Sequence, residues 1–135
     1  MEKKDELIDS YGYQTEIFSN SYYMMGRLLD KDFVKKEVEK RGLAELFIYG
    51  GGYLGIQLHR AISPFVNVFS VVDKKGKLLI DSIDDIPIMD IETFKCRYGN
   101  QPIIVTPLKF YREIFTELRE FVPEDKIIFL EEFGR

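Results

Sequence analysis

The sequence predicts an α/β protein in which a mainly parallel β-sheet carries helices on both faces. Short apolar runs typical of buried strands alternate with amphipathic segments typical of helices. The connections between them are short, and this alternation favours parallel strands joined by right-handed crossovers. The chain has 135 residues, which is enough for one domain with a sizeable core.

The first forty residues predict two helices that precede the sheet. The first has an apolar stripe at helical spacing. Its members are Phe18, Tyr22, Met25 and Leu29. In the second helix, Asp32 is the expected N-cap and Gly42 the expected terminator. The apolar face of this second helix consists of Phe33, Val34 and Val38.

We expect both apolar faces to cover part of the sheet that follows, and a dimer contact is the alternative. The chain is therefore divided into a helical extension, residues 1–42, and an α/β domain, residues 43–135. No internal repeat or low-complexity segment interrupts this organisation.

Four apolar runs after Leu43 are the strongest strand candidates. They cover residues 46–49, 66–73, 102–107 and 126–130. A fifth run, "IPIMD", has room only for a short edge strand, because Pro87 cannot donate to a ladder. Before it, "DKKGK" predicts a turn at Gly76, and a short "LLI" run follows that turn.

One helix is expected between the runs at 46–49 and 66–73, and another between "IPIMD" and the run at 102–107. The first begins near Tyr53 and ends before Pro64. Its apolar positions are Leu54, Leu58, Ala61 and Ile62. In the second, Asp90 is expected to cap residues 91–98 and Gly99 to close them. Its inward positions are Ile91, Phe94 and Tyr98.

A third helix is expected to begin directly after the run at 102–107. Thr106 would be its N-cap, and Pro107 would take the first position, where a missing N–H costs nothing. Pro123 would end this helix. Its buried face consists of Tyr111, Ile114, Phe115, Leu118 and Val122.

These elements fit a Rossmann-like sheet of five strands in the order 3-2-1-4-5, preceded by the two N-terminal helices. In such a sheet, ligands bind beyond the carboxyl ends of the strands, at the point where the strand order reverses. Here that point lies between the strand at 46–49 and the strand at 103–106.

Four of the ten glycines lie in "GGGYLG", residues 50–55, at the end of the first strand. Gly50, Gly52 and Gly55 match the pattern G-x-G-x-x-G. In the dinucleotide fingerprint the first glycine makes a tight turn, the second lets a pyrophosphate approach, and the third packs the helix on the strand. The helix that begins near Tyr53 would direct N–H groups and its positive dipole end toward a phosphate. The alternative is that a tight strand-to-helix turn needs glycine whether or not a ligand binds.

An acidic residue at the end of the second strand would bind ribose hydroxyls in the same fingerprint. Asp73 lies there, 23 residues after Gly50, and its carboxylate would favour NAD over NADP by repelling a 2′-phosphate. Alternatively, Asp73 only opens the turn that follows. The candidate ligand-binding residues are Gly50, Gly51, Gly52, Tyr53, Leu54, Gly55, Asp73 and Thr106.

Two of these candidates, Thr106 and Tyr53, also have a purely structural interpretation, and no functional role is expected for His59 or Cys96. Thr106 would overlook the same cleft, although a cap role also explains it. Tyr53 would lie over a ligand or pack on the surface beside the loop. His59 lies opposite the apolar stripe of its helix, so we expect it to be exposed. Cys96 is expected to be an inert, partly buried thiol.

Composition and charge narrow the class of protein. The net charge is −4, with 23 acidic and 19 scattered basic residues, which argues against a nucleic-acid partner. One cysteine cannot form an intramolecular disulfide and, with one histidine, cannot complete a zinc site. No apolar run approaches the roughly 18 residues of a membrane span, and the N-terminus lacks a signal peptide's apolar core. We expect a cytoplasmic protein without a membrane span or a metal site.

The pieces "LFIYGGGYLGIQLHRAI…VNVFSVVDKKGK…IDDIPIMDIETF…QPIIVTP" resemble the small Rossmann-like domains attached to bacterial sugar-modifying proteins. These include N-terminal domains of sugar O-acyltransferases of the sialic-acid acetyltransferase type. Similar domains precede the catalytic part of membrane polysaccharide-biosynthesis nucleoside-diphosphate-sugar dehydratases. The likeness covers residues 44–131, and it departs from the usual pattern at Gly51 and Asp85, where alanine or another small residue and glycine are usual. It implies a nucleotide or nucleotide-sugar site at Gly50, Gly52, Gly55 and Asp73.

The leading hypothesis is a nucleotide-binding module with NAD or a UDP-sugar as its ligand. It would act as a homodimer or as a piece of a larger sugar-pathway protein. A dehydrogenase needs a further half-sheet or domain, and the sequence has no Tyr-x-x-x-Lys pair at Tyr98 or Tyr111. No nucleophile or general base is expected to face the cleft, so we do not expect catalysis by this chain alone.

Two alternatives stay open at this point. The first is a ligand-free Rossmann-like domain for interaction or oligomerisation, which the aromatic-rich leading segment with Phe18, Tyr22 and Tyr23 favours. The second is an NAD-dependent enzyme that acts through a partner subunit, which would need a catalytic residue that the sequence does not reveal.

Overall fold

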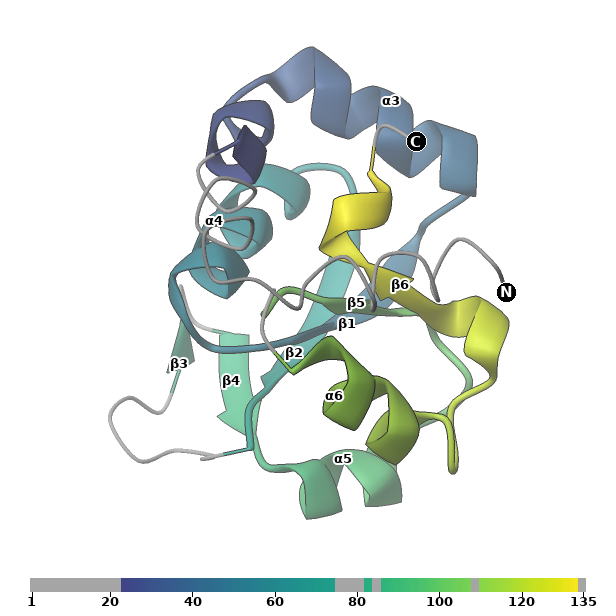
Figure 1. Cartoon of the computed structure of the whole chain (residues 1–135). Helices are drawn as coiled ribbons and strands as arrows, with labels where there is room; N and C mark the ends of the chain where they lie inside the picture. Colours follow the sequence, from purple (N-terminus) through teal and green to yellow (C-terminus); the bar gives the residue numbers. More distant parts are fainter. Residues whose placement is uncertain (1–22, 75–81, 84–85, 108–109, 134–135) are drawn as a thin grey trace.

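The computed structural model describes residues 23–74, 82–83, 86–107 and 110–133 (Figure 1). It confirms the predicted α/β class and the order of the five parallel strands, which is β4-β2-β1-β5-β6, with the short β3 antiparallel to β4 at the edge. The strands are β1 (Glu45–Tyr49), β2 (Asn67–Val72), β3 (Ser82–Ile83), β4 (Ile86–Met89), β5 (Ile103–Val105) and β6 (Ile127–Phe129).

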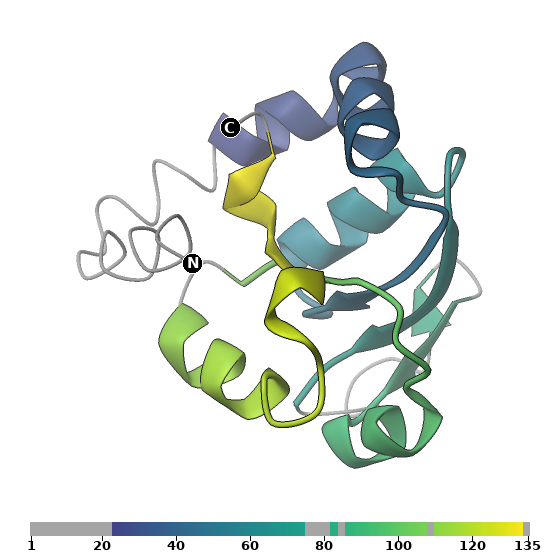
Figure 2. The same cartoon turned by 90° about the vertical axis from the view of Figure 1, so that its right-hand side faces the viewer.

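Helices cover both faces of the sheet. Among the described residues the helices are residues 23–28, α3 (Lys31–Arg41), α4 (Tyr53–Ile62), α5 (Ile91–Arg97) and α6 (Tyr111–Leu118), with 3₁₀ turns η1 (Glu124–Lys126) and η2 (Leu130–Glu132). Figure 1 and Figure 2 show α3 and α4 on one side of the sheet and α5 and α6 on the other. Along β1, Leu46 and Ile48 face the α4 side, whereas Phe47 and Tyr49 face the α6 side. This alternation gives the protein two apolar cores.

The carboxyl ends of three neighbouring strands meet at one edge of the sheet. Tyr49, the last residue of β1, is in register with Val72 at the end of β2 and with Val105 at the end of β5. The strand order reverses between β1 and β5, so the expected switch point lies directly beyond Tyr49.

The N-terminal helices cover the sheet as expected, but with a different stripe in the first of them. Met24 and Leu28 are buried in the same core as Val34 and Val38 of α3, whereas Leu29 is 75% exposed. The sequence has Met24 beside Met25 and, four residues later, Leu28 beside Leu29. Either member of each pair gives an apolar stripe at i, i+4 spacing, so the periodicity cannot choose between the two stripes. Phe18 and Tyr22, the other members of the predicted stripe, lie outside the described residues.

Helix α3 begins earlier than the sequence predicted. Its N-cap is Asp30 and not Asp32, because Asp30 Oδ1 accepts hydrogen bonds from the N–H groups of Asp32 (3.0 Å) and Phe33 (3.2 Å). Asp32 lies instead in the first turn, where its charge favours the positive end of the helix dipole. Gly42 is confirmed as the terminator, with φ +63°.

The prediction for α5 is right at its start and wrong at its end. Asp90 Oδ1 accepts from the N–H of Thr93 at 2.8 Å, which confirms the N-cap. The helix closes at Tyr98, and the positive φ of 82° belongs to Asn100 and not to Gly99. Asparagine tolerates this left-handed conformation better than most residues, so the glycine was not needed for it.

Helix α6 begins at Tyr111, four residues after the predicted first position, Pro107. Its N-cap is Phe110, in the left-handed conformation with φ +63°, so Thr106 does not cap it. The predicted face of this helix is nevertheless confirmed. Tyr111, Ile114, Phe115, Leu118 and Val122 are all buried.

Strand β4 is not the edge strand that the sequence predicted. β3 pairs with it on the outer side, with Ser82 opposite Pro87. The carbonyl of Pro87 still accepts a hydrogen bond from Ser70 Oγ of β2 at 2.7 Å. The predicted turn at Gly76, the "LLI" run and Asp85 lie outside the described residues.

Candidate functional site

The glycine loop follows β1, and its first and last glycines are required by the fold. Gly50 has φ +110°, and a Cβ there would lie 2.5 Å from Thr106 Oγ1. A Cβ on Gly55 would lie 1.8 Å from the carbonyl oxygen of Gly50, because α4 packs directly on the end of β1. These are the tight turn and the close helix–strand contact that the fingerprint assigns to its first and third glycines.

Asp73 contacts the loop from the end of β2. Its Oδ2 accepts a hydrogen bond from the N–H of Gly51 at 2.7 Å, and a Cβ on Gly51 would lie 3.1 Å from the same oxygen. The N–H of Gly50 donates to the carbonyl of Val72 at 2.7 Å. The first two amides of the loop are therefore engaged within the protein, so the predicted phosphate cradle is narrower than the whole loop.

Gly52 differs from the other three glycines of the loop. It is the N-cap of α4, with φ −81° and ψ −165°, and no heavy atom lies within 4 Å of the position that a Cβ would take. No side chain caps this end of α4, although the N–H groups of a helix's first turn have no partner inside the helix. Tyr53, the first residue of α4, is 70% exposed beside this end, and Leu54 is partly buried between the two cores.

Thr106 lies beneath the loop and not in the cleft as predicted. It is 1% exposed, and both its N–H (3.0 Å) and its Oγ1 (2.8 Å) donate to the carbonyl of Tyr49. No helix begins at Pro107, so the Thr106 hydroxyl does not cap a helix. It fixes the end of β1 under Gly50. The sequence pattern brings this residue to the site, but as support for the loop.

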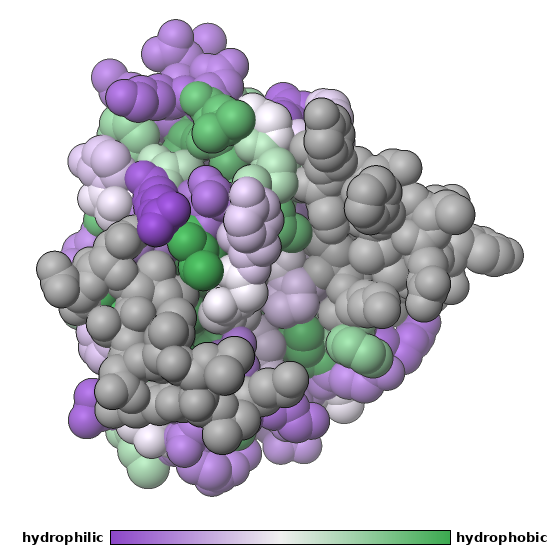
Figure 3. Space-filling view, turned by 90° about the vertical axis from the view of Figure 1, so that its left-hand side faces the viewer, coloured by the Kyte–Doolittle hydropathy of each residue, from purple (hydrophilic) through white to green (hydrophobic). Residues whose placement is uncertain are grey.

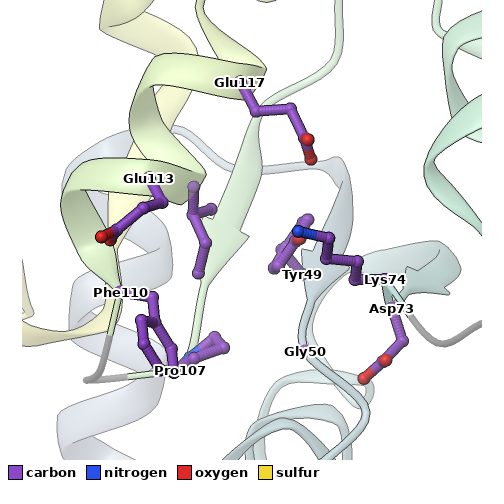
Figure 4. Close-up of a pocket in the computed structure, with 9 residues that line it drawn as sticks. Tyr49, Gly50, Asp73, Lys74, Pro107, Phe110, Glu113 and Glu117 are labelled. Carbon is purple, nitrogen blue, oxygen red and sulfur yellow. The ribbon is translucent and has the colours of Figure 1, made fainter.

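A cavity of about 490 Å³ lies beside the loop, between α6 and the carboxyl ends of β1 and β2 (Figure 4). This volume is within the range of roughly 300–1,000 Å³ that is typical of small-molecule sites. Its lining includes two candidates that the sequence identified, Gly50 and Asp73. The remaining residues are Tyr49, Lys74, Pro107, Phe110, Glu113, Ile114 and Glu117.

Tyr49 is the residue of this cavity lining that carries a hydroxyl. It is 4% exposed as a residue, and its hydroxyl makes no hydrogen bond to the described part of the protein. Burial, together with the negative charges of Glu117 and Asp73, raises the pKa of Tyr49 to about 12. The phenol therefore stays protonated at neutral pH and can donate a hydrogen bond into the cavity.

Most of this lining was not predictable from the sequence. Tyr49 directly precedes the glycines, and its position at the end of the central strand was a usable signal. Glu113 and Glu117 are four residues apart on α6 and therefore share a helix face, but only the fold turns that face toward β1. Phe110 gave no signal, because nothing in its sequence neighbourhood predicts a phenylalanine with positive φ.

His59 and Cys96 both differ from their predicted environments. His59 is buried, with 4% exposure, in a helix on which α3 packs. Cys96 is exposed on α5. Neither residue lines the cavity. The residues that the structure describes contain no group of three or more His, Cys, Asp or Glu side chains that could hold a metal ion.

The fold and the loop together define a Rossmann-like α/β protein with a glycine-rich first βα turn. Compared with known proteins, the chain matches no protein-family model and no curated protein. Within the described segments, no helix combines the length and the apolar character that crossing a bilayer requires.

Proposed function

We propose that this chain is a nucleotide- or nucleotide-sugar-binding module that holds a diphosphate at the glycine loop, residues 50–55. The observation that supports this most is the open space at Gly52. Packing inside the protein accounts for the glycines at 50, 51 and 55, whereas it does not require one at 52. A glycine at this position has a clear use if a ligand approaches the backbone there.

The diphosphate would bind at the first turn of α4. The amides of Tyr53 and Leu54 belong to this turn, and the positive end of the helix dipole adds to their attraction for an anion. The engagement of the Gly50 and Gly51 amides moves the expected contact toward the helix, away from the tip of β1.

Asp73 would bind the ribose of the same nucleotide. Its bond to Gly51 fixes the orientation of the carboxylate at the end of β2. A carboxylate has about four lone-pair sites, so it can accept from ribose hydroxyls as well. A 2′-phosphate would meet this negative charge, and we therefore propose NAD or a UDP-sugar and not NADP as the ligand.

The module is proposed as a binding unit and not as an enzyme in its own right. A tyrosine that acts as a general base needs a pKa near the working pH, whereas the pKa of Tyr49 is raised to about 12. Because the sequence resembles domains of bacterial sugar-modifying proteins, we propose that the module serves polysaccharide synthesis or sugar modification. In that setting the chain would supply the nucleotide site of a larger protein or of a homodimer.

The second candidate is a ligand-free domain for interaction or oligomerisation. The bond between Asp73 and Gly51 favours it, because that bond stabilises the loop without a ligand. Figure 3 shows one side of the molecule, and there the apolar residues of the described part form small groups between polar ones. The described residues on this side form no broad apolar face, and we therefore rank nucleotide binding first on the open space at Gly52.

A thermal-shift and calorimetry screen against NAD, NADP, UDP and UDP-sugars tests the proposal. A ligand present at 100 times its Kd should stabilise the protein by about 2.7 kcal/mol. The decisive variant is Gly52→Val, because the extended backbone and open space at this position accept a branched side chain. We expect it to lower the melting temperature by no more than about 5 °C and to abolish the ligand-induced shift.

Gly26→Ala is the matched control, since Gly26 also has no heavy atom within 4 Å of its Cβ position and does not line the cavity. It should leave nucleotide binding unchanged. Absence of binding across the panel at millimolar ligand refutes the proposal, and equal binding by wild type and Gly52→Val refutes the placement of the diphosphate.

A further inference from the structure

The cavity beside the loop has no role in holding a diphosphate at α4, but two residues of its lining also belong to the loop or contact it. Gly50 is the first residue of the loop and Asp73 accepts from the Gly51 amide, and both also line the cavity. A group attached to the far end of a diphosphate on the loop would therefore reach the space between α6 and β1. The chemistry of the lining indicates what that group can be.

One lining residue carries a hydrogen-bonding group that the described protein does not use. The Tyr49 side chain is more than nine-tenths buried, and Figure 4 shows it between the loop, Lys74 and Glu117. Its hydroxyl oxygen makes no hydrogen bond to the described protein and is not one of its fully buried unpartnered atoms, so water or a ligand in the cavity can reach it and accept from it. Tyr49 therefore marks a position for a hydrogen-bond acceptor inside the cavity.

The charges around this hydroxyl are mainly negative. Three carboxylates line the cavity, those of Asp73, Glu113 and Glu117, against one ammonium group, that of Lys74. In Figure 4 the Glu117 side chain extends from α6 toward Tyr49. A second anion in the same space would be repelled at short range. The apolar part of the lining is formed by Pro107, Phe110 and Ile114.

We propose that this cavity is a subsite for a non-anionic ring attached to the far side of the diphosphate. The Tyr49 hydroxyl donates a hydrogen bond to the ring, the apolar residues pack on its face, and Glu113 and Glu117 exclude a negatively charged group. The ring is the sugar of a nucleotide sugar or the nicotinamide riboside of NAD. This inference rests on the proposed function.

Two pairs of ligands test the proposal, and the members of each pair differ by one carboxylate. UDP-glucose is compared with UDP-glucuronate, and NAD with nicotinic acid adenine dinucleotide. In the pair that binds, we expect the carboxylated member to have a Kd about tenfold higher at low salt. The pair that shows this difference identifies the source of the ring.

Two conservative variants assign the effect to the cavity. Glu117→Gln should reduce the discrimination within the pair severalfold, and it should lower the pKa of Tyr49, which ultraviolet titration follows without a ligand. Tyr49→Phe should weaken binding of the non-anionic member by up to about tenfold. UDP or ADP alone, which lack the ring, should bind both variants as they bind the wild type.

The outcomes separate this proposal from the one on which it rests. If wild type binds neither pair, both proposals fall. If the carboxylated members bind as tightly as their partners, or if Tyr49→Phe binds like wild type, the nucleotide site stands and the cavity subsite is overturned. A loss of binding by Glu117→Gln without a change in discrimination would overturn it as well.

Discussion

Gly55 is where helix α4 touches the end of strand β1. The position of its missing Cβ, 1.8 Å from a backbone carbonyl oxygen, leaves no rotamer by which a side chain could avoid the contact. At Gly52, three residues earlier, the same position is empty. Two glycines of one motif therefore have different physical origins, one in packing and one in access.

This difference predicts a large loss of stability for alanine at position 55 and a small one for alanine at position 52. Gly55→Ala should destabilise the protein by about 3 kcal/mol, because the backbone of β1 or α4 must move. Gly52→Ala should cost less than about 1 kcal/mol, the difference between glycine and alanine at an N-cap. Urea denaturation of the two variants measures both values, and similar losses in the two would contradict this account of the loop.

The motif could be found from the sequence, but its surroundings could not. Spacing alone identified the glycines and Asp73, since the fingerprint is defined by positions along one βαβ unit. His59 was assigned to the surface because a helical pattern shows which side of α4 is apolar but not what packs on its other sides. Tyr49 and Glu117 come together only through the packing of α6, some sixty residues later in the chain.

Helix α6 begins with an unusual residue. Phe110 is its N-cap, lies in the left-handed conformation and is 66% exposed at the cavity. A bulky residue in this conformation is strained, and an aromatic side chain cannot accept from the amides of the first turn. The start of α6 is therefore less stable than a polar residue would make it, which is consistent with a role for the ring in the cavity.

Replacing this residue should stabilise the helix. We expect Phe110→Asn to raise the free energy of unfolding by about 1 kcal/mol, because asparagine tolerates positive φ and because little buried area is lost. Guanidinium denaturation without ligand measures the change. A destabilised variant would show that the ring contributes more to packing than its exposure indicates.

The predicted elements were right where one strong local signal acted alone. Asp90 was identified as an N-cap because no other acid competes with it, whereas α3 has two candidates, Asp30 and Asp32, and the structure uses the first. The predicted start of α6 was wrong because Thr106 and Pro107 have the sequence pattern of a helix start, whereas the Thr106 hydroxyl donates to the carbonyl of Tyr49 at the end of β1. The two-residue β3 is too short for any periodicity to reveal.

The two cores lie on opposite faces of the sheet, and the order of strands that separates them was predictable. Alternating strands and helices with short connections allow few arrangements, so topology rules were sufficient for the 3-2-1-4-5 order. The core on the α6 face is rich in aromatic residues and includes two tyrosines with altered ionisation. Burial and the nearby Asp125 raise the pKa of Tyr98 to about 12, and its hydroxyl donates to the Gln101 carbonyl at 2.8 Å.

These tyrosines predict how the stability of the protein responds to alkaline pH. The folded state keeps the two phenols protonated up to about pH 12, whereas the unfolded chain loses these protons near pH 10. Their contribution to stability is therefore constant below about pH 10 and is lost as the pH rises toward 12.

Denaturant unfolding between pH 8 and 12 measures this loss. The slope should be smaller in a Tyr49→Phe, Tyr98→Phe double variant than in wild type. Tyr53→Phe is the control, because this residue is 70% exposed. Equal slopes in wild type and the double variant would contradict the role of the two buried phenols.

The core on the α4 face joins early and late parts of the chain. Met24 and Leu28 belong to the same cluster as Leu130 and Phe133, and Arg41 Nη2 donates to the carbonyl of Glu132 at 2.7 Å. During translation, the first helices leave the ribosome long before the residues that complete their contacts. We therefore expect a nascent chain stalled before residue 128 to expose these apolar side chains to chaperones and proteases, and protection to appear only when the final strand and turn emerge.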